Sequence, residues 1–226
     1  MSRIILYHGS GVIVDKPKFG EGNPHNDYGL GFYCTQNDNL SREWAVTESR
    51  DGWSNRYAVD TAGLRILDFS DAEYNILHWI TVLVNNRGFT LKSEISRRGK
   101  EFLTASYSVD IDRYDIIRGY RADDSYFTFA DAFLNNTIST RRLSEALRPG
   151  KPGEQIVIKS RRAFDRLEFL GYEKVHSSEY YPLRKARSDE ARRSFLSDKA
   201  GGFRKDDIYL VDIMRGGIDK NDPRLQ

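Results

Sequence analysis

The chain has 226 residues, of which 39% are hydrophobic and 30% are charged, and its formal net charge is +2 at pH 7. This composition predicts one folded domain with a sizeable core, and it excludes a disordered chain and wholesale binding to polyanions. The single cysteine, Cys34, excludes an internal disulfide framework and fits a reducing compartment. No apolar run reaches membrane length and no signal segment opens the chain, so we expect a cytoplasmic protein with no membrane partner.

The first part of the chain is predicted to hold three strands and two helices. Apolar, β-branched and aromatic runs predict the strands, and the first of them ends in Tyr7-His8-Gly9-Ser10. Ser70 and Glu73 have the spacing of a helix capping box, and the apolar period after them runs to Gly88. The expected elements are strands at 3–7, 28–35 and 64–69 and helices at 39–49 and 70–88.

The second part mixes strands and helices without regular alternation. We expect strands at 114–120 and 154–160, helices at 125–136 and 139–148, and a Ser-capped helix at 160–172. Pro149 is expected to stop the second of these helices. The irregular order favours an α+β domain over a doubly wound sheet. We expect residues 1–171 to form the core and residues 172–226 to form an extension packed on the same domain.

The segment from Tyr28 to Thr35 is unusual because it places three aromatic residues and two glycines within eight positions. Glycine weakens a strand, and it often marks a point where a ligand or another backbone comes close. Aromatic rings next to such positions favour a flat ligand lying against the chain. The four histidines, by contrast, show no metal-ligand spacing among themselves or with Cys34. We therefore expect no metal site.

Three motifs in order along the chain resemble the ADP-ribosyltransferases of the diphtheria-toxin and poly(ADP-ribose)-polymerase branch. The sequences of these enzymes contain, in this order, an aromatic-His-Gly-Ser motif, a Gly-x-Gly-x-Tyr motif, and a Glu or a substitute on a late strand. The matching segments here are Tyr7 to Ser10, Gly29 to Tyr33, and the strand that opens with Glu154-Gln155. Ser41 and Trp44 fall at the offsets of a Ser and a second stacking aromatic in the helix that follows.

The chain is also similar to a prokaryotic family of stand-alone transferase-like proteins, catalogued as a domain of unknown function. That family places Asp before the glycine motif, as Asp27 does here, and an Ala-Asp-Asp step at Ala122 to Asp124. It also opens its late strand with Gln. The resemblance covers roughly residues 3–170, and the tail after residue 172 is much less diagnostic.

The resemblance implies a split β-sandwich with flanking helices that takes NAD⁺ as substrate and transfers ADP-ribose to a macromolecule. The acceptor is expected to be a protein or a nucleic acid, RNA included. The same resemblance implies a bacterial toxin or phage-defence effector, with an antitoxin protein as partner. Two rival functions are an inactive module that binds NAD⁺ or ADP-ribose, and an NAD⁺ glycohydrolase whose acceptor is water. A plain nucleic-acid-binding protein that uses the basic segment 184–205 is a third.

The resemblance also assigns roles to individual residues. Tyr33 and Trp44 would stack on the nicotinamide cation. Gly9 would offer its backbone to the carboxamide, and His8 and Ser10 would bind the ribose hydroxyls. The expected binding set is His8, Gly9, Ser10, Asp27, Tyr28, Gly31, Tyr33, Ser41 and Trp44, and the expected catalytic set is His8, Tyr33, Glu154 and Gln155.

The late strand leaves one choice open. Glu154 and Gln155 are neighbours in a strand, so only one of them can face the pocket. The prokaryotic pattern favours Gln155, whereas the polymerase-type pattern fits Glu154 equally well, and we favour Gln155 narrowly. Gln155 can orient the ribose but cannot act as a base, and the proton of the acceptor would then go to an aspartate at 27, 123 or 124.

Each of these residues, taken alone, fits an ordinary structural role better. His8 fits a hydrogen-bonded core residue, and the aromatic residues of the second strand fit core or cross-strand packing. The two glycines fit a bulge, and Asp123-Asp124 fits a helix cap. Their joint occurrence in the same order is what favours the transferase interpretation.

Overall fold

Two β-sheets form the framework of the structure, a computed structural model that describes residues 3–122, 124–147, 154–200, 204–216, 218–219 and 222–225. The first sheet has the strand order β1-β3-β7 and is antiparallel, with β1 at Arg3–Ser10, β3 at Gly52–Asp60 and β7 at Leu167–Val175. Its register places His8 opposite Asn55. A register shift between Arg56 and Tyr57 marks a bulge in the pairing of β3 with β7.

The second sheet has the order β2-β6-β5-β4, and only the β4–β5 pair is parallel. Its strands are β2 at Phe32–Cys34, β4 at Ile66–Asp68, β5 at Ile116–Tyr120 and β6 at Glu154–Ile158. The two sheets meet where Tyr7 of β1 and Thr35, just after β2, exchange two backbone hydrogen bonds of 2.8 and 2.9 Å. This junction brings the first predicted motif next to the second.

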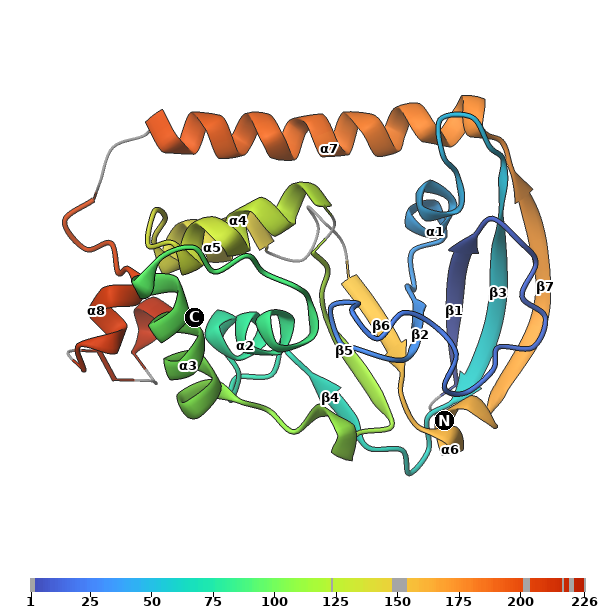
Figure 1. The fold of residues 1–226 in the computed structure, drawn as a ribbon. Helices are drawn as coiled ribbons and strands as arrows, with labels where there is room; N and C mark the ends of the chain where they lie inside the picture. The colour runs from blue at the N-terminus through green and yellow to red at the C-terminus, as the bar shows by residue number, and fades with distance from the viewer. Residues whose placement is uncertain are drawn as a thin grey trace.

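Helices cover one side of the second sheet, and the first sheet lies on its other side (Figure 1). The longest helix, α7, starts at the end of β7 and passes over α1 to α4 and α5, all three of which it contacts. Among the described helices, none combines the length and the apolar character that crossing a membrane requires. The helices are α1 Asp38–Ala45, α2 Ile76–Asn86, α3 Glu94–Tyr107, α4 Asp124–Leu134, α5 Thr140–Leu147, α6 Arg161–Phe164, α7 Ser177–Ala200 and α8 Leu210–Met214, with 3₁₀ turns η1 Ile111–Arg113 and η2 Pro223–Leu225.

The hydrophobic core has two main parts, one on each face of the second sheet. The larger cluster packs α2, α3, α4, α5 and α8 against one face and includes Trp79, Phe133 and Val157. The smaller cluster lies between the two sheets and includes Leu6 and Cys34. Because burial raises the pKa of the Cys34 thiol far above its usual value, Cys34 is an apolar core residue and not a reactive thiol.

The structure confirms the α+β class and corrects two element predictions. Ser70 does not cap a helix, because its hydroxyl donates to Asp68 Oδ1 and α2 starts only after Asn75, whose side chain accepts from Leu77 N. Ser160 does cap a helix, but α6 ends at Phe164 and the rest of the predicted helix is strand β7. Pro149 and Arg148 lie outside the described residues.

Candidate active site

A pocket of about 280 Å³ lies beside the face of the second sheet that carries Tyr33 and Gln155. Four of the predicted site residues share this pocket although they come from three separate segments of the chain. Its lining residues are Asn26, Asp27, Tyr33, Trp44, Arg87, Arg121, Ala122, Gln155 and Arg184.

The alternation of β6 decides which neighbour faces the pocket. Ile156 belongs to the cluster between the sheets, whereas Val157 belongs to the helical cluster, so Gln155 points to the same side as Val157. Glu154 points the other way, is half-buried and forms an ion pair with Arg118 of β5. The narrow preference for Gln155 therefore agrees with the structure, and Glu154 lies outside the pocket wall.

Two buried polar atoms in the pocket wall have no hydrogen-bond partner among the described residues. They are Oε1 of Gln155, a residue only 8% exposed, and Nε1 of Trp44. Buried polar groups in native proteins are nearly always paired, and leaving one unpaired costs about 1–3 kcal/mol. One acceptor and one donor in the same wall are therefore left for a polar partner, a bound water or a ligand.

Tyr33 is fixed by the loop that precedes it. Its hydroxyl donates to Gly29 O at 2.6 Å and accepts from Tyr28 N at 3.0 Å, which leaves its ring as the part that lines the pocket. Gly29 closes this loop with a φ of +70°, a conformation that favours glycine. The loop therefore fixes the ring of Tyr33 in the pocket wall and satisfies its hydroxyl with backbone hydrogen bonds.

The glycines of both motifs make room for protein and not for a ligand, which corrects the expected reason for their presence. A Cβ on Gly31 would lie 2.5 Å from Val157 Cγ1, and a Cβ on Gly9 would lie 1.8 Å from Ser41 O. Gly31 thus lets β2 approach β6, and Gly9 lets α1 approach β1. The N–H and C=O groups of Gly9 are directed to the side of β1 on which β2 lies. Tyr7 bonds to Thr35 on that side, and alternate residues of a strand direct these groups to the same side.

His8 adjoins the pocket through the backbone of Tyr33. Its Nδ1 lies 2.7 Å from Tyr33 O, and its ring packs on Phe32 with 4.4 Å between ring centroids. A carbonyl oxygen only accepts, so Nδ1 carries the proton and Nε2 of the neutral ring is an acceptor. Burial lowers the pKa of His8 below 6.5, although the Tyr33 carbonyl opposes this shift.

The lowered pKa of His8 predicts a loss of stability in mild acid. The unfolded chain takes up this proton near pH 6.5 and the folded chain only at lower pH, so the contribution of neutral His8 is complete above pH 6.5 and is lost as the pH falls through the folded pKa. We expect the His8→Gln variant to show a flatter decline of Tm between pH 7 and pH 5 than the wild type. A His25→Gln variant, in which an exposed histidine is changed, should keep the wild-type decline; equal declines in all three proteins would refute the assignment.

Asp27 is the carboxylate of the pocket wall, and it is 4% exposed. It accepts from Ala122 N at 2.9 Å and pairs with Arg87 Nη1 at 3.1 Å. Burial raises its pKa, while the Ala122 amide and the Arg87 guanidinium oppose the shift. Asp27 therefore holds the glycine loop to the start of α4 and carries a carboxylate that can bind a proton near the pocket.

Three arginines make the electrostatic character of the pocket. Arg87 is tied to Asp27 and also donates to Ala122 O at 2.6 Å. The guanidinium carbon of Arg121 lies 4.7 Å from the centre of the Trp44 ring. Arg184 reaches the pocket from α7. Among the described lining residues, three guanidinium groups accompany one carboxylate, so this part of the wall favours an anionic ligand group.

The remaining predicted residues lie outside the pocket wall. Tyr28 is fully buried, and its hydroxyl bonds to Tyr120 O and Trp79 Nε1, so it is a core residue. Ser41 is also fully buried and bonds to Ser54 and Asp38. Ser10 donates to Val12 O in the following loop. Asp123 lies outside the described residues, as does the side chain of Asp124.

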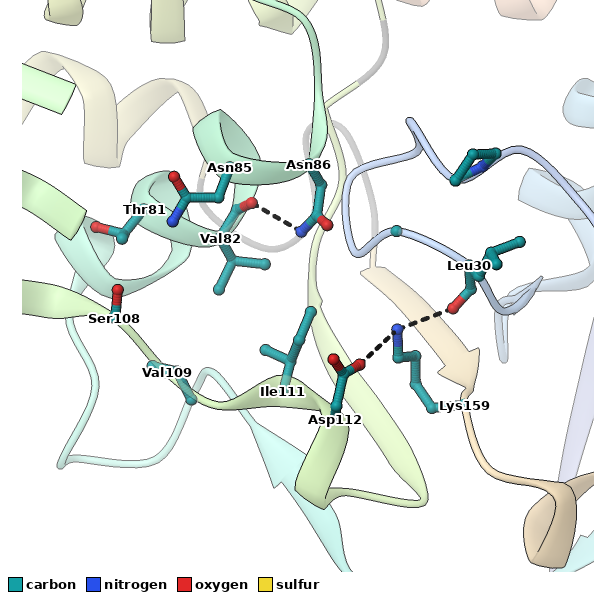
Figure 2. Close-up of a pocket in the computed structure, with 12 residues that line it drawn as sticks. Leu30, Thr81, Val82, Asn85, Asn86, Ser108, Val109, Ile111, Asp112 and Lys159 are labelled. Carbon is teal, nitrogen blue, oxygen red and sulfur yellow. Dashed lines mark hydrogen bonds and ion pairs between the residues drawn. The ribbon is translucent and has the colours of Figure 1, made fainter. Parts of the chain in front are cut away.

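A second hollow, of about 420 Å³, lies between α2 and the loop around Leu30 (Figure 2). Its polar groups already have partners. Lys159 Nζ donates to Leu30 O at 2.9 Å and pairs with Asp112 at 3.4 Å, and Asn86 Nδ2 donates to Val82 O at 2.9 Å. The smaller pocket has unpaired atoms and excess charge, and it is therefore the better candidate.

Comparison with known proteins assigns the chain to a family. The family described as "Protein of unknown function (DUF3990)" matches residues 4–169. The chain belongs to this family. No curated protein and no solved structure gives a significant match. The matched segment carries all the pocket residues except Arg184.

Sequence reasoning missed the three arginines and Asn26 of the pocket. Asn26 precedes Asp27, and Arg121 precedes Ala122, two residues that the resemblance had marked. Their positions next to marked residues could have identified them as candidates for the site. Arg87 lies beyond the end of α2, and its sequence context gives no sign of a role. Arg184 belongs to the basic segment 184–205, which we connected with nucleic-acid binding and not with this pocket.

Proposed function

We propose that this DUF3990 protein is an NAD⁺-dependent mono-ADP-ribosyltransferase with a split β-sandwich core. The observation that carries the proposal is the pair of unpartnered buried atoms, Gln155 Oε1 and Trp44 Nε1, in a wall that also presents the ring of Tyr33. Nicotinamide needs both elements: its ring stacks on an aromatic face, and its carboxamide and ribose hydroxyls need donors and acceptors. The junction of two sheets beside this wall also suits the fold that the resemblance implies.

In the proposed reaction, the bond between C1′ of the ribose and N1 of nicotinamide breaks, and its electron pair leaves with neutral nicotinamide. The nucleophilic atom of the acceptor then bonds to C1′ and loses its proton. Gln155 Oε1 would accept from a hydroxyl of the nicotinamide ribose, and His8 Nε2 would accept from a ribose hydroxyl as well. The rings of Tyr33 and Trp44 would hold the nicotinamide cation. These contacts fix the sugar while charge develops on it.

The proton of the acceptor needs a base, and Gln155 cannot serve as one. Asp27 is the carboxylate among the described residues of the wall, and burial raises its pKa, which makes it a stronger proton acceptor than an exposed carboxylate. We therefore assign Asp27 as the base of the proposed transfer. The biological role that goes with this reaction, a toxin or phage-defence effector held by an antitoxin, rests on the family resemblance.

A module that binds NAD⁺ or ADP-ribose without turnover is the second candidate. Two observations favour it. The amide of Gln155 cannot accept a proton, and the carboxylate of Asp27 is already bonded to Arg87 and to the Ala122 amide. Nicotinamide release separates the two functions, since a binding module retains the glycosidic bond.

Variants of Tyr33 test the proposal. Tyr33→Ala removes the stacking face, which at about 1–2 kcal/mol corresponds to an about 5- to 30-fold slower release of nicotinamide. Tyr33→Phe keeps the face and loses the hydroxyl that binds the glycine loop, so it should lower Tm and keep release within about threefold of wild type. Release is followed by chromatography, with far-UV circular dichroism to verify folding. Equal release by both variants would remove Tyr33 from the proposed site.

A further inference from the structure

The C-terminal helix α7 lies outside the matched family segment, which ends at residue 169, and yet its Arg184 lines the pocket. We infer that Arg184 binds the diphosphate of the dinucleotide and that α7 thereby completes the binding site. This inference rests on the proposed function for the identity of the ligand. It gives the extension a role in binding that neither the motifs nor the family match assigns.

The position of α7 is set by contacts before and after Arg184 along the helix. At its start, Ser177 N donates to Asp51 Oδ1 at 2.9 Å, and the Ser177 hydroxyl donates to Thr47 O at 2.6 Å. Further along, Arg187 makes two hydrogen bonds, of 2.7 and 2.9 Å, to Glu43 of α1. Glu43 is buried and a paired carboxylate of this kind fixes geometry. These contacts hold the turn that carries Arg184 over α1, the helix of Trp44 (Figure 1).

Arg184 itself has donors to spare. One guanidinium N–H donates to Val46 O at 2.7 Å, and within the described part of the chain its other N–H groups have no acceptor. Guanidinium carries five N–H donors in a planar fork that matches phosphate oxygens. The residue is exposed, so its remaining N–H groups are accessible to a ligand.

The charge of the pocket decides which part of the ligand meets this residue. Among the described residues of the wall, Arg87, Arg121 and Arg184 outnumber the carboxylate of Asp27. A cationic nicotinamide gains nothing from this excess, whereas a diphosphate carries two negative charges. The aromatic and amide groups of Tyr33 and Gln155 come from the sheet, and Arg184 comes from the opposite, helical side. The dinucleotide would thus lie with nicotinamide on the sheet and diphosphate under α7.

The test is a titration of the full chain with two probes, ADP-ribose, which has the diphosphate, and nicotinamide riboside, which lacks it. We expect Arg184→Ala to weaken ADP-ribose binding about tenfold, the loss typical of a charge-assisted hydrogen bond at a partly exposed site. Arg184→Lys should recover part of this loss, because it keeps the charge without the fork. Lys185→Ala removes the same charge from the next residue, which is exposed and lies outside the pocket wall.

The expected pattern is a selective loss of ADP-ribose affinity in Arg184→Ala, less than twofold change in Lys185→Ala, and equal affinity of all variants for nicotinamide riboside. Tm should be unchanged in Lys185→Ala and slightly lower in Arg184→Ala, which loses the hydrogen bond to Val46 O. An Arg184→Ala variant that binds ADP-ribose as Lys185→Ala does, or a wild type that binds no ADP-ribose, would overturn the inference. ADP-ribose binding that depends on Arg184 in a protein that never releases nicotinamide would sustain the inference and reject the transferase.

Discussion

Replacing Gln155 with leucine is expected to raise the free energy of unfolding by about 1 kcal/mol and to abolish nicotinamide release. Oε1 of Gln155 is buried without a partner, so an apolar side chain of similar size removes a desolvation cost in the free protein. The same change removes the acceptor that would hold the ribose hydroxyl. For a chain of this length, 1 kcal/mol corresponds to a rise in Tm of about 2–4 °C. A variant that is more stable and inactive is the signature of a residue kept for ligand binding.

The matched control for this prediction is Glu154→Gln. Glu154 is the neighbour of Gln155, points to the opposite side of β6 and pairs with Arg118. Its change should leave nicotinamide release within about twofold of wild type, because Glu154 lies outside the pocket wall. It should alter the free energy of unfolding by at most about 1 kcal/mol, because the ion pair is partly exposed. Tm is followed by calorimetry and release by chromatography. A Gln155→Leu variant that is less stable than wild type, or one that still releases nicotinamide, would contradict the assignment.

Replacing Gly9 with alanine is expected to destabilise the protein by about 3 kcal/mol or more, which corresponds to a fall in Tm of about 6–12 °C. The added Cβ would lie 1.8 Å from Ser41 O and 2.8 Å from Ala45 N, both of them backbone atoms of α1. Backbone atoms cannot rotate away, so α1 has to move from β1. Because α1 carries Trp44, the same change should also weaken NAD⁺ binding.

Gly88→Ala is the control for Gly9→Ala. A Cβ there meets no atom within 4 Å, and its φ is not in the left-handed region, so the change should alter Tm by less than about 2 °C. Thermal unfolding of the three proteins under one set of conditions is sufficient. If Gly9→Ala has the Tm of Gly88→Ala, then the close approach of α1 to β1 is not a feature of the folded protein.

Apolar periodicity was enough to predict the elements that bury one simple face. The strands at β1, β5 and β6 and the helices at α4 and α5 agree with their predicted ranges to within a few residues. Strand β3 was missed because polar residues interrupt its pattern inside the core. Asn55 is fully buried and bonds to Val14 N and His8 O, which no local pattern announces. The first part of strand β7 was predicted as helix from its local sequence. The prediction failed because pairing with β3 overrides this local preference.

The candidate site could be predicted where a motif carries it and not where only tertiary contact does. The three motifs, the helix offsets and the prokaryotic family pattern led to Tyr33, Trp44, Asp27 and Gln155, which the structure brings to one pocket. The same motifs included Tyr28 and Ser41, whose hydroxyls turn out to bond within the protein. Arg184 could not be foreseen, because its place depends on the ion pair between Arg187 and Glu43, 144 residues apart. The division at residue 171 stays a prediction, although that position lies within β7.

The most direct measurement is an incubation of the purified protein with ³²P-labelled NAD⁺ and whole-cell lysate, in which nicotinamide release and transfer of label are followed together. Half of each sample is treated with RNase, and Gln155→Leu serves as the inactive reference. We expect wild type to release nicotinamide and to label a macromolecule, with RNase sensitivity showing whether that macromolecule is RNA. Nicotinamide without label would identify a glycohydrolase. If a folded wild-type protein neither releases nicotinamide nor transfers label, the proposed chemistry is contradicted.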